Sequence, residues 1–273
     1  MAKIIKNIEV FFMLISALVT GIFGGYAKQE KDTIFIGHRG YSGLYQENTE
    51  EAFIKAGQKG FGGCETDVRV TKDGVLVLCH NNEMKYADGD EMEISSHTFA
   101  ELSSKPIKNR KTRTELYICS FERYLEIMKE YNMFCFVELK GAYTPEQIDL
   151  LYRTMTTVYD LSAISVQGGG IDVMSLLHER HPDVPVMYCA GENDDKEIQQ
   201  ALDQGFDVDL HLLVSDIDWV AKFHEKGLRV AVWTANDPAK VSYALKCGVD
   251  FIESDFFCGV LKPYISLPGK IGK

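Results

Sequence analysis

The sequence has no pair of cysteines separated by two residues, which is the spacing used by zinc knuckles and redox motifs. A zinc knuckle is therefore disfavoured. Several cysteines lie within apolar runs such as VLVLCH and MFCFVEL, where a free thiol behaves as a small hydrophobic group. We expect mostly free, buried thiols rather than a disulfide framework. The cysteines are Cys64, Cys79, Cys119, Cys135, Cys189, Cys247 and Cys258.

Long basic runs, internal repeats and low-complexity tracts are also absent. The formal net charge is −11, and 25% of the residues are charged. A nucleic-acid surface must neutralise many phosphates, so this composition argues against a nucleic-acid partner and favours a small-molecule substrate. The length of 273 residues allows one large core or two small ones.

The first 27 residues differ in pattern from the rest of the chain. Lys3 and Lys6 precede an uncharged run from Val10 to Gly25, and the charged stretch KQEKD follows. This is the layout of a secretory signal peptide, with a retained membrane anchor as the alternative. A buried first helix is disfavoured because the run has no polar face. We expect residues 1–27 to be a signal peptide or anchor of an exported protein, periplasmic or extracellular, and residues 28–273 to form the catalytic domain.

From Thr33 onward, short apolar runs alternate with longer amphipathic segments. The amphipathic segments carry helix start and stop signals, such as Thr144 and Pro145 before one segment and Gly248 after another. Strand and helix alternating eight times predicts an α/β fold, a (β/α)8 TIM barrel. The eight predicted strands are 33–37, 63–70, 133–139, 163–167, 184–190, 208–212, 229–234 and 251–254.

One segment interrupts this alternation after the second predicted strand. TKDG is typical of a tight turn, and VLVLCH (75–80) is typical of the hairpin partner that follows it. Residues 81–119 are polar and show no clear apolar period. We interpret them as a small insertion that forms a lid or rim at the barrel mouth.

Polar residues stand at the ends of several predicted strands. In barrels of this type, the C-terminal ends of the strands converge on one mouth, and that mouth holds the active site. The candidate residues are His38, Arg39, Glu65, Asp67, His80, Glu138, Lys140, Trp233 and Asp255.

The spacing of the acidic residues predicts a metal site. Side chains alternate along a strand, so Glu65 and Asp67 share one face, as do Glu138 and Lys140. Three carboxylates in a barrel core need a counter-charge, and a hard divalent cation such as Mg²⁺ or Ca²⁺ suits oxygen ligands. The alternative is a pair of salt bridges, Glu138 with Lys140 and Asp67 with Arg69.

The two histidines suit general acid-base catalysis, because imidazole gains and loses a proton near neutral pH. Arg39 follows His38 directly, and its planar guanidinium matches the oxygens of a phosphate. A cation, an arginine, a lysine and two histidines around one mouth describe a site for phosphoryl transfer.

Five stretches together resemble the motifs of the glycerophosphodiester phosphodiesterase family, which is related in fold to phosphatidylinositol-specific phospholipase C. They are GHRGYSGLYQENTEEAF, ETDVRVTKDGVLVLCH, FVELK, VAVWTAND and GVDFIESD. The likeness covers Ile34 to Asp255. It implies a TIM barrel with an insertion after strand two and hydrolysis of glycerophosphodiesters to glycerol 3-phosphate and an alcohol.

The resemblance also implies a role for each matching residue. His38 and His80 would be the acid-base pair, and Glu65, Asp67 and Glu138 would hold the divalent metal. Arg39 and Lys140 would contact the phosphate, Trp233 would contact the glycerol, and Glu47 and Asn48 would support the site.

The sequence departs from the family pattern at a few positions. Gln46 replaces the usual proline before Glu-Asn, and Asn81 replaces the aspartate that usually follows the second histidine. Asn81 is the more consequential change, because an asparagine could lower the pKa of His80 and the rate.

Two other functions stay open. One is a lysophospholipase D-like activity on larger lipids, which requires an apolar groove beside the mouth. The other is a catalytically weakened barrel that binds glycerophosphodiesters without hydrolysing them. A basic cluster in the insertion could attract anionic lipid or substrate, although a solvated loop is the simpler interpretation; it consists of Lys105, Lys108, Arg110, Lys111 and Arg113.

Overall fold

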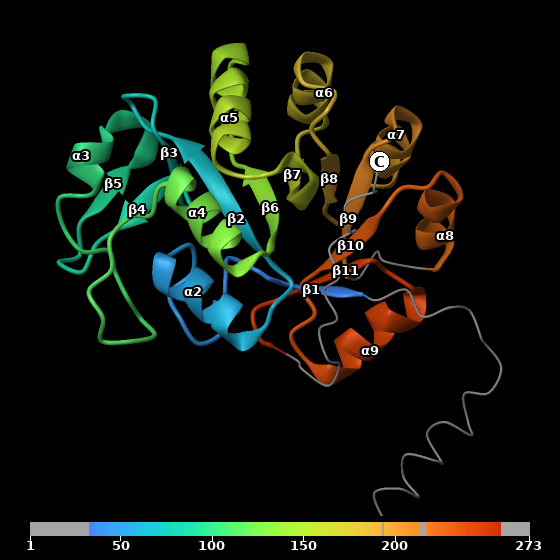
Figure 1. Cartoon of the computed structure of the whole chain (residues 1–273), viewed down its shortest axis with the longest axis horizontal. Helices are drawn as coiled ribbons and strands as arrows, with labels where there is room; N and C mark the ends of the chain where they lie inside the picture. The colour runs from blue at the N-terminus through green and yellow to red at the C-terminus, as the bar shows by residue number, and fades with distance from the viewer. Residues whose placement is uncertain (1–32, 193, 213–216, 258–273) are drawn as a thin grey trace, which may run out of the picture. The chain divides into compact units, whose positions relative to one another are not determined.

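Parallel strands pair in a closed ring of eight at the centre of the molecule (Figure 1). The computed structural model describes residues 33–192, 194–212 and 217–257, and the ring is counted within them. It closes because β1 pairs with β11 on one side and with β2 on the other. The fold is the (β/α)8 barrel expected from the sequence. Its strands are β1 (Ile34–Gly37), β2 (Gly63–Val70), β6 (Phe134–Leu139), β7 (Ile164–Gly168), β8 (Val186–Ala190), β9 (Asp207–His211), β10 (Val230–Trp233) and β11 (Phe251–Ser254).

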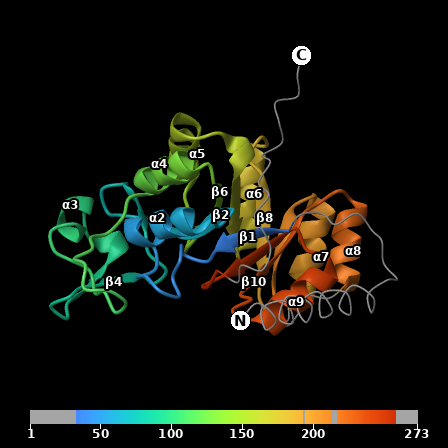
Figure 2. The ribbon, with the colours of Figure 1, turned by 60° about the horizontal axis from the view of Figure 1, so that its bottom comes forward.

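Helices surround these strands and follow the capping signals of the sequence (Figures 1 and 2). The Thr49 side chain accepts a hydrogen bond from the backbone of Ala52, and Thr144 forms a capping box with Gln147. Gly248 ends its helix in the left-handed conformation, as predicted for a C-cap glycine. The helices are α2 (Glu50–Lys59), α4 (Phe121–Tyr131), α5 (Pro145–Val158), α6 (Ile171–Arg180), α7 (Asp195–Gln204), α8 (Ile217–Glu225) and α9 (Pro238–Cys247), with a short 3₁₀ turn η2 (Leu161–Ala163) before β7.

The hydrophobic core of the barrel has two parts. A large shell of buried side chains lies between strands and helices, and it includes Phe53, Tyr124 and Phe223. A smaller cluster contains side chains that alternate onto the inner face of the barrel. Its members are Ile36, Phe134, Phe136, Met187, Ala231 and Phe251.

Polar side chains occupy the barrel interior next to this inner cluster. Glu65 lies two residues after Gly63 on β2, and Glu253 lies two residues after Phe251 on β11, so both continue an inward-facing row. In the pairing of β2 with β6, Asp67 lies directly opposite Glu138. The buried polar residues of the interior include Glu65, Asp67, Ser165, Gln167, Asp209 and Glu253.

The segment after β2 folds as an appendage beside the barrel. β3 (Leu76–Leu78) pairs antiparallel with the end of β2, which confirms the predicted hairpin. The sequence analysis assigned no elements to residues 81–119, but they form the hairpin β4 (Glu83–Lys85) and β5 (Glu91–Glu93), the turn η1 (Ile94–Ser96) and the helix α3 (Phe99–Leu102). Figures 1 and 2 both place α3 and β4 to one side of the barrel. A separate small core holds this appendage together and includes Tyr86, Ile94 and Leu102.

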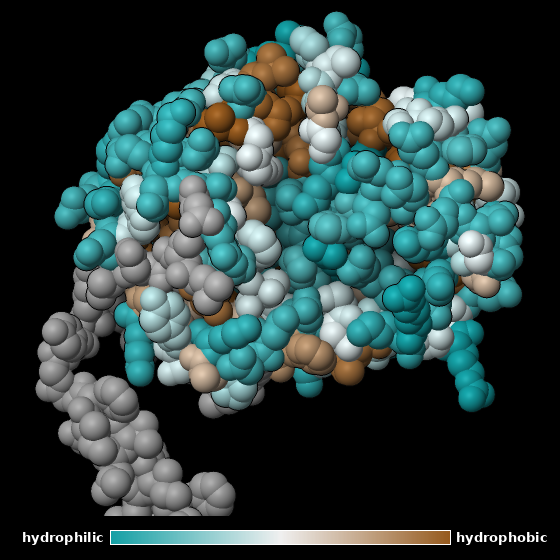
Figure 3. All heavy atoms as spheres, turned by 180° about the vertical axis from the view of Figure 1, so that it is seen from behind, coloured by the Kyte–Doolittle hydropathy of each residue, from teal (hydrophilic) through white to brown (hydrophobic). Residues whose placement is uncertain are grey.

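Most of the surface in Figure 3 is hydrophilic, with hydrophobic side chains gathered mainly along one edge. In the described ranges, no helix is long and apolar enough to cross a membrane. Residues 1–27 lie outside these ranges, so the signal peptide or anchor stays a prediction. Among the described residues, the thiols of Cys64, Cys79, Cys119, Cys135 and Cys189 form no disulfide, and all of these cysteines except Cys189 are buried. Burial raises the pKa of the Cys64, Cys119 and Cys135 thiols, which keeps them protonated.

The capping box of α5 provides a test of how the sequence positions the helices. Thr144→Ala removes the oxygen that accepts the backbone N–H of Gln147, and we expect a loss of about 1 kcal/mol in the free energy of unfolding. Urea denaturation measures this change. Thr144→Ser keeps the oxygen and should retain most of the stability. Equal stability of the alanine variant and the wild type would contradict the role of the cap.

Candidate active site

His38 leaves the end of β1 and is held by a carboxylate from the other end of the chain. Its Nδ1 lies 2.7 Å from Oδ1 of Asp255, just after β11. Ser42 Oγ donates to the same carboxylate over 3.0 Å, and Asn236 Nδ2 donates over 2.7 Å. Burial opposes ionisation of Asp255, but the bond to His38 and the other donors outweigh it and lower its pKa. The imidazole is therefore fixed by an ionised, anchored partner.

Arg39 adopts a left-handed backbone conformation, with φ 57°, and this turns the chain toward β2. Its backbone N–H donates to Oε2 of Glu65 over 2.8 Å. Gly40 follows with φ 81°, and a Cβ there would come within 2.8 Å of the Ala52 side chain, so the turn requires glycine. His38, Arg39 and Gly40 thus form a local turn that places an imidazole and a guanidinium at the barrel mouth.

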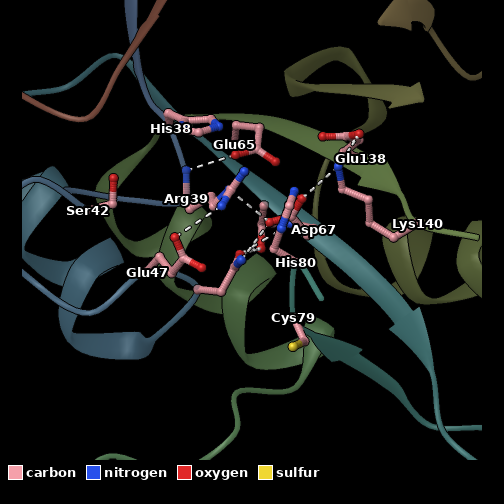
Figure 4. Close-up of polar contacts among 12 residues, drawn as sticks. His38, Arg39, Ser42, Glu47, Glu65, Asp67, Cys79, His80, Glu138 and Lys140 are labelled. Carbon is pink, nitrogen blue, oxygen red and sulfur yellow. Dashed lines mark hydrogen bonds and ion pairs between the residues drawn. The ribbon is translucent and has the colours of Figure 1, made fainter. Parts of the chain in front are cut away.

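Three carboxylates come together below this turn, as the sequence predicted (Figure 4). Oxygens of Glu65, Asp67 and Glu138 all lie within 4.8 Å of one another. Glu65 is only 1% exposed. Its burial, together with the neighbouring acidic groups, raises its pKa well above the usual value.

Asp67 is the best-compensated member of this group. Its Oδ2 lies 3.2 Å from Nε of Arg39 and accepts a 2.7 Å hydrogen bond from Asn48, while its Oδ1 lies 3.2 Å from Nζ of Lys140. Burial opposes ionisation, but these cations and the amide lower its pKa. Burial also disfavours the charged forms of Arg39 and Lys140, yet the surrounding carboxylates raise the pKa of both.

Glu47 and Asn48 support Arg39 and Asp67 from the loop before α2. Arg39 Nη1 donates to Glu47 over 3.1 Å. Asn48 is left-handed with φ 55°, a conformation that asparagine tolerates, and its Oδ1 accepts from Thr66 Oγ1 over 2.8 Å. Both residues therefore contact side chains of the candidate site, Glu47 through Arg39 and Asn48 through Asp67.

His80 follows β3, and its backbone is fixed from β2. Arg69 donates from Nε to the carbonyl of Cys79 over 3.0 Å and from Nη2 to the carbonyl of His80 over 2.6 Å. The His80 Nδ1 lies 3.2 Å from Oδ1 of Asn81. Arg69 thus positions the second histidine.

A pocket of about 580 Å³ connects the two histidines with the appendage. His38, Arg39, Glu47, Asn48, His80 and Asn81 line its barrel side. The appendage contributes Met84, Lys85, Ile107, Lys108, Arg110 and Lys111, and Phe256 completes the wall. Residues 81–119 therefore form a rim of the candidate site.

The donor set fits a divalent cation. Oε1 of Glu65 is buried and accepts no hydrogen bond within the described structure. Its neighbours Asp67 and Glu138 offer further oxygens at ligand spacing, and hard cations such as Mg²⁺ and Ca²⁺ prefer oxygen ligands. The alternative to a metal site was a pair of salt bridges. One of them is present, because Glu138 pairs with Lys140 at 2.5 Å. The other is not, because Arg69 donates to backbone carbonyls at 2.6 and 3.0 Å instead of pairing with Asp67.

Trp233 is the candidate that the polar network does not include. It ends β10, where its ring packs edge-on against His211 with centroids 4.9 Å apart. The sequence indicated no role for Asn236, Asp209 or Glu253. It indicated Arg69 only as a salt-bridge partner of Asp67. Asp209 lies opposite the inward-facing Ala231, and Glu253 lies two residues after the inward-facing Phe251, so both acids are on the inner face of the barrel.

Comparisons with known proteins identify the family that combines this fold with this site. The model of the glycerophosphoryl diester phosphodiesterase family matches residues 38–257. The chain therefore belongs to this family of enzymes, which confirms the resemblance seen in its motifs.

Individual relatives agree with this assignment over most of the chain. A glycerophosphodiester phosphodiesterase of Bacillus altitudinis is 23% identical over 232 residues, covering 82% of this chain and 95% of the relative. The crystal structure of a glycerophosphodiester phosphodiesterase from Parabacteroides distasonis is 27% identical with a TM-score of 0.69, covering 83% and 94% of the two chains. A phosphodiesterase of Oleispira antarctica, solved with the product sn-glycerol-3-phosphate, shares the fold with a TM-score of 0.73 at 21% identity, covering 82% and 93%.

The Asp255 carboxylate gives a pH-dependent prediction. Its pKa is lowered in the folded chain, so its ionised form stabilises the fold. That stabilisation is complete above the pKa of an unfolded aspartate, about 3.9, and is lost as the pH falls through the folded value. Asp255→Asn should therefore be less stable than the wild type at pH 7, and the difference should shrink near pH 3.

Chemical denaturation at the two pH values measures this difference. Glu115→Gln, at an exposed position outside the helices, is the matched control and should change little at either pH. A deficit of Asp255→Asn that is as large at pH 3 as at pH 7 would show that the charge is not what stabilises the fold.

Proposed function

We propose that this chain hydrolyses glycerophosphodiesters to glycerol 3-phosphate and an alcohol by acid-base catalysis with His38 and His80, using one divalent cation, Mg²⁺ or Ca²⁺. One observation carries the proposal. Both histidines and Arg39 line a single pocket, directly beside three carboxylates at ligand spacing.

The two histidines differ in their partners, and this assigns their roles. His38 contacts Asp255 through Nδ1 at 2.7 Å, so Nε2 is the nitrogen left to accept a proton, and the carboxylate stabilises the imidazolium that forms. His38 therefore deprotonates the nucleophile, which is water or the glycerol hydroxyl adjacent to the ester. Attack by water gives glycerol 3-phosphate directly, whereas attack by the hydroxyl gives a cyclic phosphate that water must then open. His80 stands between the barrel and the appendage and protonates the leaving alkoxide.

The phosphate lies between these histidines in the proposal. Arg39 faces the pocket and Lys140 lies beside Asp67 and Glu138, so both cations oppose charge that develops on the phosphoryl oxygens. A bound divalent cation would add Lewis-acid stabilisation of the same charge. Trp233 offers an apolar surface to the glycerol, and Glu47 and Asn48 keep Arg39 and Asp67 in place.

The appendage side of the pocket then receives the leaving alcohol. Lys85, Lys108, Arg110 and Lys111 line it together with Met84, Ile107 and Phe256. Basic side chains in an acidic protein attract an anionic substrate to the mouth. Because basic and apolar side chains alternate along this wall, it suits a compact polar alcohol better than an acyl chain.

The proposal is tested by release of glycerol 3-phosphate from a panel of glycerophosphodiesters, with and without chelator. His38→Ala and His80→Ala should each lower kcat about 10²-fold or more, because each removes a proton-transfer group. Chelation should abolish turnover, and added Mg²⁺ or Ca²⁺ should restore it. His178→Ala, at an exposed position of α6, is the matched control and should keep wild-type kcat.

Other results would contradict the proposed mechanism, the proposed substrate or turnover itself. Activity that survives both the chelator and His38→Ala would overturn the mechanism. Turnover of lysolipids alone would replace the substrate with that of a lysophospholipase D-like enzyme. Binding of glycerophosphodiesters without any turnover would show a catalytically weakened barrel.

The effect of Asn81 on kcat distinguishes a fully active enzyme from a catalytically weakened one. Its Oδ1 lies 3.2 Å from Nδ1 of His80, so Asn81→Asp would place a carboxylate at the same contact. A negative charge there stabilises protonated His80, the form that donates to the leaving group. We expect a higher kcat and activity that extends to higher pH. A pH–rate profile checks both, and an unchanged or lower kcat would show that Asn81 does not limit the rate.

A further inference from the structure

The barrel interior holds more acidic groups than one metal site uses. Asp209 and Glu253 are buried on β9 and β11 at 0% and 1% exposure, and acidic neighbours of Glu253 include Asp209 and Glu138. Arg39 pairs with Glu47 and Asp67, and Lys140 pairs with Asp67 and Glu138. Among the described residues, neither Asp209 nor Glu253 therefore has an ion-pair partner, and burying carboxylates without one is costly.

A second set of ligand atoms lies beside the first. A ring nitrogen of His38 and carboxylate oxygens of Glu65 and Glu253 lie within 4.8 Å of one another. Glu65 belongs to both sets, and its buried Oε1 accepts no hydrogen bond from any described residue. Figure 4 shows His38 and Glu65 side by side at the top of the cluster.

Each member of this second set is oriented as metal ligands are. Metal-binding histidines commonly donate their other ring N–H to a carboxylate, and Asp255 lies 2.7 Å from Nδ1 of His38. Gln167 Nε2 donates to Glu253 Oε1 over 3.2 Å. The backbone of Arg39 fixes Glu65 Oε2 over 2.8 Å, which leaves Oε1 for a cation.

We propose that His38, Glu65 and Glu253 form a second divalent-cation site, which takes Zn²⁺ and shares Glu65 with the first site. One imidazole and two carboxylates suit zinc, whereas Mg²⁺ and Ca²⁺ prefer a set of oxygens. Zinc there occupies the His38 nitrogen that accepts the proton in catalysis. The second site is therefore inhibitory, and this consequence rests on the proposed function.

Direct binding of Zn²⁺ to the metal-stripped full chain tests the site without any assay of activity. Equilibrium dialysis with elemental analysis gives the affinity of the wild type and two variants. Glu253→Gln should weaken Zn²⁺ binding about tenfold or more, because it removes a ligand. Glu138→Gln removes a ligand of the first site and only an acidic neighbour of Glu253, so it should weaken Zn²⁺ binding much less than Glu253→Gln does.

Two further variants complete the binding experiment. Glu122→Gln, at an exposed position of α4, is the matched control and should bind Zn²⁺ as the wild type does. Glu253→Asp retains the charge with a shorter side chain, so it should weaken binding less than Glu253→Gln and covers the case in which the glutamine variant fails to fold. Weakening by Glu138→Gln but not by Glu253→Gln would place zinc in the first site and overturn the proposal. Equal affinity of all variants would overturn it as well.

The inhibitory role has a separate readout. Zn²⁺ added to Mg²⁺- or Ca²⁺-activated enzyme should lower the rate of the wild type, and Glu253→Gln should need about tenfold more Zn²⁺ for the same fractional loss. Equal sensitivity of the two would contradict inhibition through this site. A chain that binds Zn²⁺ through Glu253 but hydrolyses no substrate would refute the proposed function and leave the second site standing.

Discussion

Buried negative charge in the barrel is the constraint on which the rest of the site depends. Glu65, Asp67 and Glu253 stand on inward-facing positions next to an apolar cluster and are almost fully buried. Burying carboxylates is costly unless hydrogen bonds or cations compensate them. The surrounding structure supplies part of this compensation through Arg39, Lys140 and Asn48, all of which converge on Asp67. Glu65 and Glu253 are compensated much less, and the proposed cations would offset that difference.

The same constraint explains the local structure around the first strand. The left-handed turn at Arg39 and Gly40 brings a backbone N–H to Glu65 and a guanidinium to Asp67. His38 stands at the start of this turn, between the Glu65 carboxylate and the Asp255 carboxylate. One turn therefore serves both the electrostatics of the interior and the chemistry of the mouth.

Much of this arrangement could be predicted from the sequence, because strand periodicity and helix caps are local signals. The eight strands, the capped helix after Thr144 and the convergence of His38, Glu65, Asp67, His80 and Glu138 followed from them. Arg69 was not predictable in its role, since its hydrogen bonds to the Cys79 and His80 carbonyls depend on how the hairpin closes. Asp209 and Glu253 were missed because their proximity arises from the closed barrel, which brings β9 and β11 together with β2 across the interior. The elements of residues 81–119 were missed because their small core is assembled from scattered single residues without a period.

The central claim is that Glu65, Asp67 and Glu138 hold a divalent cation against a phosphate bound near Arg39. A crystal structure of the full chain with Mn²⁺ and glycerol 3-phosphate, with data collected at the manganese absorption edge, tests it most directly. The account predicts an anomalous peak among these three carboxylates, with the phosphate between that peak and the two histidines. Clear density for bound glycerol 3-phosphate with no anomalous peak among these carboxylates would contradict it.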